Sequence, residues 1–266
     1  MDTDNAPRGP TAGATGGGDL LEIDGLTVAF GGVHALDGVD LGVEEGSFTG
    51  LIGPNGAGKT TMIDAVTGFV PPTRGVVRFA GHDVTGLAPS ARAELGLVRT
   101  FQSLELFEDL TVADNLAVAA EHRPWWGVLA DAIGRAPSSD TSADVDWALE
   151  LVGLTDAGDA MPVELSHGRR RLVSVARALA ARPQLMLLDE PAAGLDTAET
   201  ELLGEHLRGL PEAGITVLLI DHDMGLVLDV CTHIYVLDFG RIIASGPPST
   251  VRADPTVVAA YLGTST

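Results

Sequence analysis

Lysine is almost missing from this chain of 266 residues. Lys59 is the only lysine, and the other fifteen basic residues are arginines. The abundance of Ala, Gly and Asp beside Arg indicates a compositional bias under which Arg replaces Lys. A lysine kept under this bias has a role that arginine fills poorly, because an ammonium is a compact point charge and a guanidinium is a planar fork.

Basic residues as a whole are also few. The chain has 16 Lys and Arg against 37 Asp and Glu, which gives a net charge of −21 and a pI of about 4.4. Proteins that bind nucleic acid by themselves normally carry a basic face. We therefore expect no nucleic-acid partner, and we interpret the acidity as an aid to solubility.

Cysteine and long apolar runs are scarce too. Cys231 is the single cysteine, so no disulfide can form within the chain, which fits a reducing compartment. No run approaches the ~18 uninterrupted apolar residues that a membrane span needs. Residues 1–19 have no apolar core of the kind found in signal peptides, and we expect them to form a flexible tail.

The rest of the chain alternates between strand and helix patterns. Hydrophobic residues make up 45% of it, enough for one large domain with its own core. Short apolar runs followed by acids, as at 185–191 and 216–223, are typical of strands buried on both faces. The pattern predicts an α/β fold with a mainly parallel sheet. Strands are expected at 20–30, 39–53, 76–86, 185–191 and 216–223, helices between about 88 and 182 and at 197–210, and a hairpin at 234–246 with its turn at Phe239 and Gly240.

The lone lysine lies in a phosphate-binding motif. The segment from Gly53 to Thr60, GPNGAGKT, fits the pattern G-x-x-x-x-G-K-[ST]. Its glycines let backbone N–H groups wrap a phosphate, and the helix that starts near Lys59 offers its positive end. Lys59 reaches the β and γ phosphates, and the Thr60 hydroxyl is a ligand for Mg²⁺. The alternative, a plain glycine-rich turn from strand to helix, does not explain the whole motif between an apolar strand and an apolar-periodic helix.

A phosphate loop alone does not distinguish kinases, GTPases and ATPases. The residues at the ends of two further strands indicate which reaction the chain catalyses. Asp189 and Glu190 end an apolar strand, which suits Asp189 to hold Mg²⁺ through water and Glu190 to act as general base. His222 follows another apolar strand and is placed to sense the γ-phosphate. The structural alternatives are two acids that cap a strand and a histidine that only packs.

The order of these motifs, across about residues 20 to 263, resembles the ATP-binding subunit of ABC transporters. The segment RTFQ, which ends at Gln102, looks like the Q-loop; LSHGRRR (165–171) resembles the signature motif LSGGQ, and AGLD (193–196) looks like the D-loop. The resemblance makes His222 the switch histidine and Phe30 the aromatic residue that stacks on adenine, although Phe30 has ordinary strand packing as an alternative.

The resemblance implies a P-loop NTPase (RecA-like) core with an antiparallel β subdomain and a helical subdomain. It implies a single ABC ATPase domain over 20–266, with the helical subdomain at about 103–182 and an insertion at about 123–140. The implied cofactors are ATP and Mg²⁺, and the implied catalytic residues are Glu190 and His222. Metal binding falls to Thr60, Gln102 and Asp189, and nucleotide binding to Phe30, Gly53, Pro54, Asn55, Gly56, Ala57, Gly58, Lys59, Thr60, Thr61, Gln102, Ser166 and Gly168.

The signature motif departs from the family pattern. Ser166 and Gly168 are kept, whereas His167 and Arg169 stand where the family has Gly and Gln. In the family the kept residues close over ATP bound to a second subunit, so the resemblance implies a homo- or heterodimer of ATPase subunits. Arg169 either adds charge there or hinders closure, which leaves the turnover rate open.

Finer features resemble the ATPase subunits of branched-chain amino acid importers. These are the RTFQ…LF…LTV run, LDEPAAGLD, and the C-terminal segment VVAAYLG. About a hundred residues separate Lys59 from Ser166, too few for the coiled-coil ABC relatives, and only one cassette is present. ATPases of lipid or polysaccharide export, ATPases of urea or amide import, and soluble ABC ATPases without a membrane partner stay as alternatives.

This subfamily implies partners and a location. Integral membrane permease subunits bind the ATPase on the cytoplasmic face of the cell membrane, and an extracytoplasmic solute-binding protein acts with it indirectly. Leu104, Leu106, Phe107 and Leu110 form an apolar surface that would receive the permease, with burial in the helical subdomain as the alternative. Trp125 and Trp126 in the insertion either pack on it or rest at the membrane interface.

Overall fold

The computed structural model describes residues 18–100, 106–121 and 141–262. Gln102, Leu104, Trp125, Trp126 and the predicted insertion therefore lie outside the described residues. None of the helices in the described part combines the length and hydrophobicity that a membrane crossing needs.

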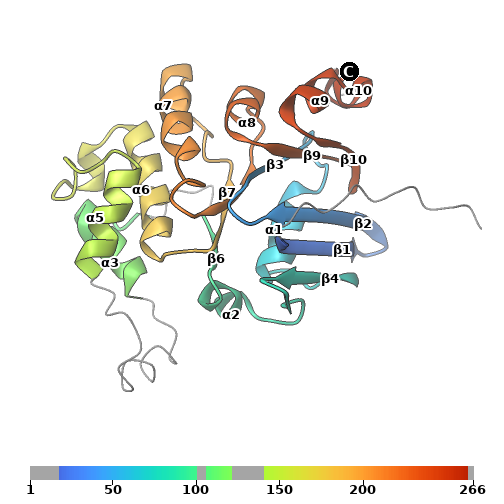
Figure 1. Cartoon of the computed structure of the whole chain (residues 1–266), viewed down its shortest axis with the longest axis horizontal. Coiled ribbons are helices and arrows are strands. Elements are labelled where there is room, and N and C mark those ends of the chain that lie inside the picture. Colours follow the sequence, from blue (N-terminus) through green and yellow to red (C-terminus); the bar gives the residue numbers. More distant parts are fainter. Residues whose placement is uncertain (1–17, 101–105, 122–140, 263–266) are drawn as a thin grey trace, which may run out of the picture.

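Two sheets and a set of helices build the described part of the chain (Figure 1). The antiparallel sheet has the strand order β2-β1-β4-β5, with β1 (Asp19–Phe30), β2 (Val33–Glu44), β4 (Arg74–Phe79) and β5 (His82–Asp83). The larger sheet has the order β10-β9-β3-β8-β7-β6, with β10 (Arg241–Gly246), β9 (His233–Asp238), β3 (Phe48–Ile52), β8 (Thr216–Ile220), β7 (Leu185–Asp189) and β6 (Leu97–Arg99). Its pairs from β9 to β6 are all parallel, as predicted, and the expected hairpin β9–β10 forms an antiparallel edge.

Helices α3, α5 and α6 lie at one end of the molecule and the antiparallel sheet lies at the other (Figure 1). These three helices contact one another and form the helical group, α7 contacts α6, and α8 contacts α7. The described helices are α1 (Lys59–Thr67), α2 (Pro89–Glu94), α3 (Val112–Ala120), α5 (Thr141–Leu151), α6 (His167–Ala180), α7 (Thr197–Arg208), α8 (Met224–Val230), α9 (Pro248–Ala253) and α10 (Pro255–Leu262), with a 3₁₀ turn at Pro162–Glu164.

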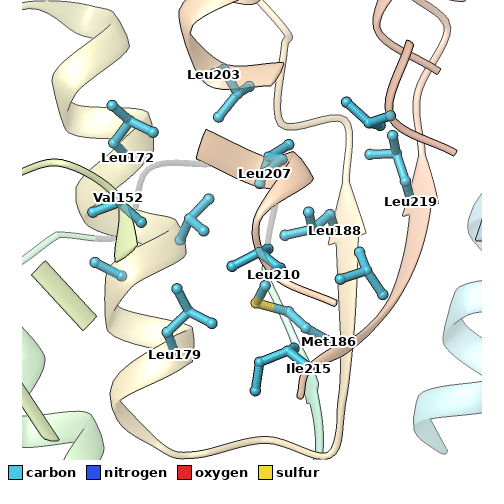
Figure 2. Close-up of a cluster of buried hydrophobic side chains, with 14 of the residues drawn as sticks. Val152, Leu172, Leu179, Met186, Leu188, Leu203, Leu207, Leu210, Ile215 and Leu219 are labelled. Atoms are coloured by element: carbon cyan, nitrogen blue, oxygen red, sulfur yellow. The ribbon is translucent and has the colours of Figure 1, made fainter. Parts of the chain in front are cut away.

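The two faces of the larger sheet belong to different hydrophobic clusters because side chains alternate along a strand. On β7, Met186 and Leu188 join the cluster under the helices, and Leu185 and Leu187 face the cluster around α1 and the antiparallel sheet. Figure 2 shows the first cluster, with side chains of α6, α7 and the strands filling one space. Burial on both faces explains why these strands are continuous apolar runs.

Two details differ from the expected elements. Strand β6 lies inside the segment expected to be helical, because its three residues carry no periodicity and are strand only by pairing with β7. The segment 39–53 contains a break at residues 45–47, where Ser47 N–H donates to Glu44 O at 3.1 Å in a turn between β2 and β3. A glycine-containing turn therefore divides what looked like one strand region.

The end of α1 is held by a buried arginine of α2. Arg92 is 1% exposed and donates to four carbonyls: Ala65 O at 2.8 Å, Val66 O at 2.6 Å, Thr85 O at 2.8 Å and Leu87 O at 3.1 Å. Burial lowers the pKa of Arg92. The carbonyls at the negative end of α1 stabilise the buried cation, and they receive donors that the helix itself cannot supply.

Candidate functional site

The predicted phosphate-binding loop connects β3 to α1. All five residues of β3 are buried, and α1 begins at Lys59, as predicted. Gly58 has a φ of +109°, and a Cβ at this position would lie 2.6 Å from Ala35 O. Both the positive φ and the close approach require glycine at Gly58. The path of the backbone into α1 therefore depends on this glycine.

The turn of the β9–β10 hairpin packs against this loop. Gly240 N–H donates to Ala57 O at 2.8 Å, and Gly240 O accepts from Asp37 N–H at 2.9 Å. A Cβ on Gly53 would lie 2.1 Å from Leu237 O, so the first glycine of the loop also touches this hairpin. The hairpin fixes the loop from outside the eight-residue motif.

Lys59 is folded back into its own loop. Its Nζ donates to Gly53 O at 2.6 Å and to Pro54 O at 3.1 Å, and the residue is only 8% exposed. Burial lowers the pKa of Lys59, and the carboxylates of Glu190, Asp189 and Asp221 act against that shift. The ammonium is thus bonded to neutral carbonyls and lies in the negative field of three carboxylates.

The carboxylates come from adjacent parallel strands, β7 and β8, whose carboxyl ends meet at one edge. Asp189 accepts from Arg99 at 2.8 Å, and the same guanidinium donates to Asp64 of α1 at 2.6 Å. Asp221 is fully buried and accepts from the backbone N–H groups of His222, Asp223 and Ala192. These bonds fix both aspartates rigidly behind the loop.

Glu190 has a backbone conformation that is rare for its residue type. Its φ is +47°, and its N–H donates to Ile220 O at 2.7 Å. Such a conformation costs about 1 kcal/mol or more in a non-glycine residue and persists only where the surroundings impose it. His222 Nδ1 lies 3.8 Å from Glu190 Oε2 and 3.6 Å from Asp221 Oδ1. The two predicted catalytic side chains are therefore neighbours.

The phosphate loop and Glu190 face one cavity of about 520 Å³. Of the predicted site residues, Asn55, Gly56, Ala57, Gly58, Lys59, Thr60, Thr61 and Glu190 line it, together with Val33, His34, Ala35, Phe239 and Gly240. The volume suits a small-molecule ligand, and its walls bring a cation, backbone amides and a carboxylate together.

Two aromatic side chains differ in their relation to this cavity. Phe30, predicted to stack on the base, is exposed at the end of β1 and pairs with the cavity residue Val33, but it does not itself line the cavity. Phe239 lines it, is 86% exposed and has a φ of +42°. The sequence predicts Phe239 only as a turn residue, because its exposure at the cavity depends on the tertiary structure.

Tyr261 is a second residue near the site that no sequence motif predicts. Helix α10 reaches the phosphate loop, since Ala259 and Ala260 share a small cavity with Pro54 and its neighbours. Burial raises the pKa of the Tyr261 phenol to about 12, and the backbone N–H of Gly53 acts in the opposite direction. The C-terminal helix thus places a neutral phenol against the first glycine of the loop.

The predicted signature residues lie at the start of α6. Ser166 is the N-cap, and its Oγ accepts from Arg169 N–H at 3.3 Å. Gly168 N–H donates to Glu199 Oε1 of α7 at 3.0 Å. The two unusual side chains find partners elsewhere: His167 lies beside Gly194, and Arg169 pairs with Asp156 at 2.5 Å. The Arg169 guanidinium holds the pKa of Asp156 below its usual range.

A separate apolar groove of about 820 Å³ lies between α2, β6 and the helical group. Phe107 and Val118 are exposed hydrophobic side chains in its wall. Leu106, by contrast, is buried in the core, so only part of the predicted apolar surface is available for docking. The groove is lined by Ser90, Ala93, Glu94, Leu95, Gly96, Val98, Phe107, Val118, Ala119, Arg177, Ala181, Arg182 and Gln184.

Comparison with known families gives two matches. The sequence model of the family described as "ABC transporter" matches residues 36–193. The model described as "Branched-chain amino acid ATP-binding cassette transporter" matches residues 241–265, the segment that contains Tyr261. The second match covers the region that touches the phosphate loop from the C-terminal side.

Individual proteins agree with these families. The chain is 41% identical over 92% of its length to the high-affinity branched-chain amino acid transport ATP-binding protein BraF of Pseudomonas aeruginosa, of which 98% is covered. A crystal structure of an ATP-binding cassette of an ABC transporter in its ADP conformation superposes with a TM-score of 0.81 and 33% identity, covering 92% of this chain and 99% of that one. A dimeric structure of a bacterial ABC transporter cassette gives a TM-score of 0.69 and 25% identity, covering 86% and 98%.

Proposed function

This chain belongs to the ABC transporter family of ATP-binding cassettes, and on that premise we propose that it hydrolyses ATP to power an importer of branched-chain amino acids. The observation that carries the proposal is the cavity in which the phosphate loop with Lys59 faces Glu190. The C-terminal match and the high identity to BraF over nearly its whole length support the choice of importer. The same C-terminal match argues against export or soluble relatives.

Nucleotide binding follows from the loop. Backbone N–H groups of residues 55–60 surround the phosphates, and Lys59 exchanges its contacts with Gly53 O and Pro54 O for phosphate oxygens. The exposed aromatic face of Phe30, or of Phe239, supplies stacking for the base. Gln102, Ser166 and Gly168 complete the predicted nucleotide contacts.

The residues present fit a magnesium ion. The four carboxylates of Asp189, Glu190, Asp221 and Asp64 interact with three cations, Lys59, Arg99 and Arg171, so the cluster has a surplus of negative charge before ATP adds more. Thr60 offers an exposed hydroxyl at the cavity, and Asp189 a carboxylate, with Gln102 as the third predicted ligand. Bound Mg²⁺ would offset the charge on the phosphoryl groups during transfer.

Hydrolysis requires a base beside the γ-phosphate. Glu190 accepts a proton from water as the water oxygen bonds to the γ-phosphorus, and the bond from that phosphorus to the β-γ bridging oxygen breaks, giving ADP and phosphate. The constrained backbone at Glu190 directs the carboxylate into the cavity. His222, 3.8 Å from this carboxylate, is placed to contact the γ-phosphate and hold the base in position.

The assembly has two kinds of partner. A second ATPase subunit supplies Ser166 and Gly168 to the ATP held by this chain, which the dimeric cassette structure supports for a related protein. The apolar groove with Phe107 and Val118 receives a helix of the membrane permease, because an amphipathic helix buries its apolar face in such a groove. The chain then works at the cytoplasmic face of the cell membrane, and a solute-binding protein outside selects the amino acid.

The experiment is co-purification of the tagged chain from gently solubilised membranes. We expect two multi-span permease proteins to accompany it, and labelled leucine uptake to fall when Glu190→Gln replaces the wild type. Phe107→Asp should abolish co-purification while the isolated chain keeps its ATPase activity. Val163→Asp, at an exposed apolar residue that does not line the groove, is the matched control. Recovery of the chain without membrane proteins would overturn the importer proposal.

A further inference from the structure

The backbone N–H of Gly168 is bonded to an acid of its own chain. Gly168 N–H donates to Glu199 Oε1 at 3.0 Å, and a Cβ on Gly168 would lie 2.9 Å from the same oxygen. The carboxylate therefore lies directly on the signature glycine. In the proposed dimer, ATP lies between two ATPase subunits, an arrangement called the ATP sandwich below. There this N–H donates to the γ-phosphate of the ATP bound to the second subunit.

The carboxylate is held in this place by the start of α7. Glu199 is the third residue of α7 and forms a capping box with Asp196. Glu199 N–H donates to Asp196 Oδ1 at 2.9 Å, and Asp196 N–H donates to Glu199 Oε2 at 3.3 Å. One carboxylate oxygen thus serves α7 and the other serves Gly168. The contact connects α7, which follows the D-loop, to the signature helix α6.

A phosphate and this carboxylate exclude each other. Both are anions, both need the same N–H, and two anions at hydrogen-bonding distance from one donor repel strongly where water is excluded. Bonds between a charged acceptor and a backbone N–H are among the stronger hydrogen bonds. ATP on the second subunit can reach Gly168 only after Glu199 has left.

We propose that Glu199 is an internal competitor of the γ-phosphate, which keeps the signature motif closed to ATP until the two subunits meet. The proposal rests on the proposed function, since it needs the ATP sandwich. Displacement of Glu199 breaks its bond to Gly168 and so removes a polar contact between the start of α7 and the start of α6, which couples dimer formation to the segment that precedes α7. The strength of the Glu199–Gly168 bond then influences the ATP concentration at which the ATP sandwich forms.

The test compares three proteins that cannot hydrolyse ATP: Glu190→Gln alone, Glu190→Gln with Glu199→Gln, and Glu190→Gln with Glu201→Gln. Glutamine at 199 keeps the shape and removes the charge, and its single amide oxygen can accept from Asp196 N–H or from Gly168 N–H but not from both. Glu201 is an exposed acid of the same helix and is the matched control. Dimer formation is measured by analytical ultracentrifugation with MgATP over a range of protein concentrations.

We expect E199Q to lower the dimer dissociation constant about tenfold, the order of one charged hydrogen bond, and E201Q to leave it unchanged. A dimer that E199Q fails to tighten, or that E201Q tightens equally, overturns the Glu199 proposal alone. A chain that stays monomeric in all three proteins overturns the homodimeric sandwich instead.

If all three proteins stay monomeric, a second measurement tests the contact between Glu199 and Gly168 directly. The amide proton of Gly168 in the isotopically labelled full chain should resonate downfield while its acceptor is a carboxylate, and should move upfield in E199Q. An unchanged resonance would overturn the contact itself, whatever the oligomeric state.

Discussion

A proposed ATP site combines the phosphate loop of one subunit with the signature segment of the other, and within one chain these two halves bond their ligand-binding groups internally in different ways. At the loop, the Lys59 cation is bonded to two neutral carbonyls, at 2.6 and 3.1 Å. At the signature, the Gly168 N–H is bonded to an anionic carboxylate at 3.0 Å. An incoming phosphate replaces weak acceptors in the first half and must expel a like charge in the second.

The difference has a consequence for the order of events. A group held by neutral partners exchanges them for phosphate with a gain in Coulomb energy, whereas a donor held by a carboxylate gains little. We therefore expect ATP to bind to the loop of the single subunit first, and the signature to engage later.

Lys59→Ala breaks the first half and has the largest expected effect. Loss of the ammonium removes positive charge that interacts with the carboxylates of Glu190, Asp189 and Asp221, and ATP brings further negative charge. We expect ATP affinity to fall by about a thousandfold, as for removal of one partner of a buried charge pair. Isothermal titration with MgATP measures it, and Lys59→Arg tests whether charge alone suffices. Normal affinity in K59A would contradict the assignment of the loop.

Glu190→Gln leaves both halves able to bind but stops the reaction. A neutral amide cannot accept the proton of the attacking water, so kcat should fall by roughly 10²–10⁴ with ATP affinity retained. Phosphate release measures the rate, and light scattering with MgATP should show an increase to dimer mass. Asp223→Asn, at the N-cap of α8, is a control for a nearby acid without a catalytic role. Unimpaired turnover in E190Q would assign the base elsewhere.

Tyr261→Phe tests whether helix α10 stabilises the phosphate loop through its contact with Gly53. The variant removes the hydroxyl that lies against Gly53 N–H and keeps the ring, so ATP affinity should fall by about three- to tenfold, as for one lost hydrogen bond. Tyr235→Phe is the matched control, because its hydroxyl donates to Gly42 O in the antiparallel sheet at 3.2 Å. Equal effects of the two variants on ATP affinity would show that the role of Tyr261 is only structural.

Arg169→Gln restores the family residue in the second half and has the smallest expected effect. Arg169 is paired with Asp156 at a partly exposed position, and such pairs contribute little to stability. We expect an unchanged melting temperature and ATP affinity but a turnover altered by about two- to threefold. Asp156→Asn, which removes the partner and keeps the arginine, separates the ion pair from the side chain. An unaltered rate would make the departure neutral.

The sequence was sufficient for one of these halves and insufficient for the other. The eight-residue loop motif predicted the turn, the start of α1 at Lys59 and the place of Thr60, because each depends on local backbone chemistry. Buried apolar runs likewise predicted β7 and β8. At the signature the motif located Ser166 and Gly168, but Glu199 lies 31 residues further along the chain, and no local pattern points back to Gly168.

The other missed features have the same physical origin. Strand β6 exists through its pairing with β7, and Phe239 and Tyr261 reach the loop through the packing of β9, β10 and α10. Such contacts depend on the tertiary arrangement, which residue periodicity does not encode. The placement of Phe30 beside the cavity, and not in its wall, is also set by the pairing of β1 with β2.

The buried Arg92 connects α2 rigidly to the end of α1. Ser90, Ala93 and Glu94 of α2 line the apolar groove, while Arg92 of the same helix holds the last carbonyls of α1, whose first residue is Lys59. Two of the four Arg92 bonds, to Ala65 O and Val66 O, join α2 to α1, and the other two hold Thr85 O and Leu87 O in the segment before α2. A displacement of α2 at the groove would therefore also displace the end of α1. Because α1 has only nine residues, that movement would reach Lys59 at its start.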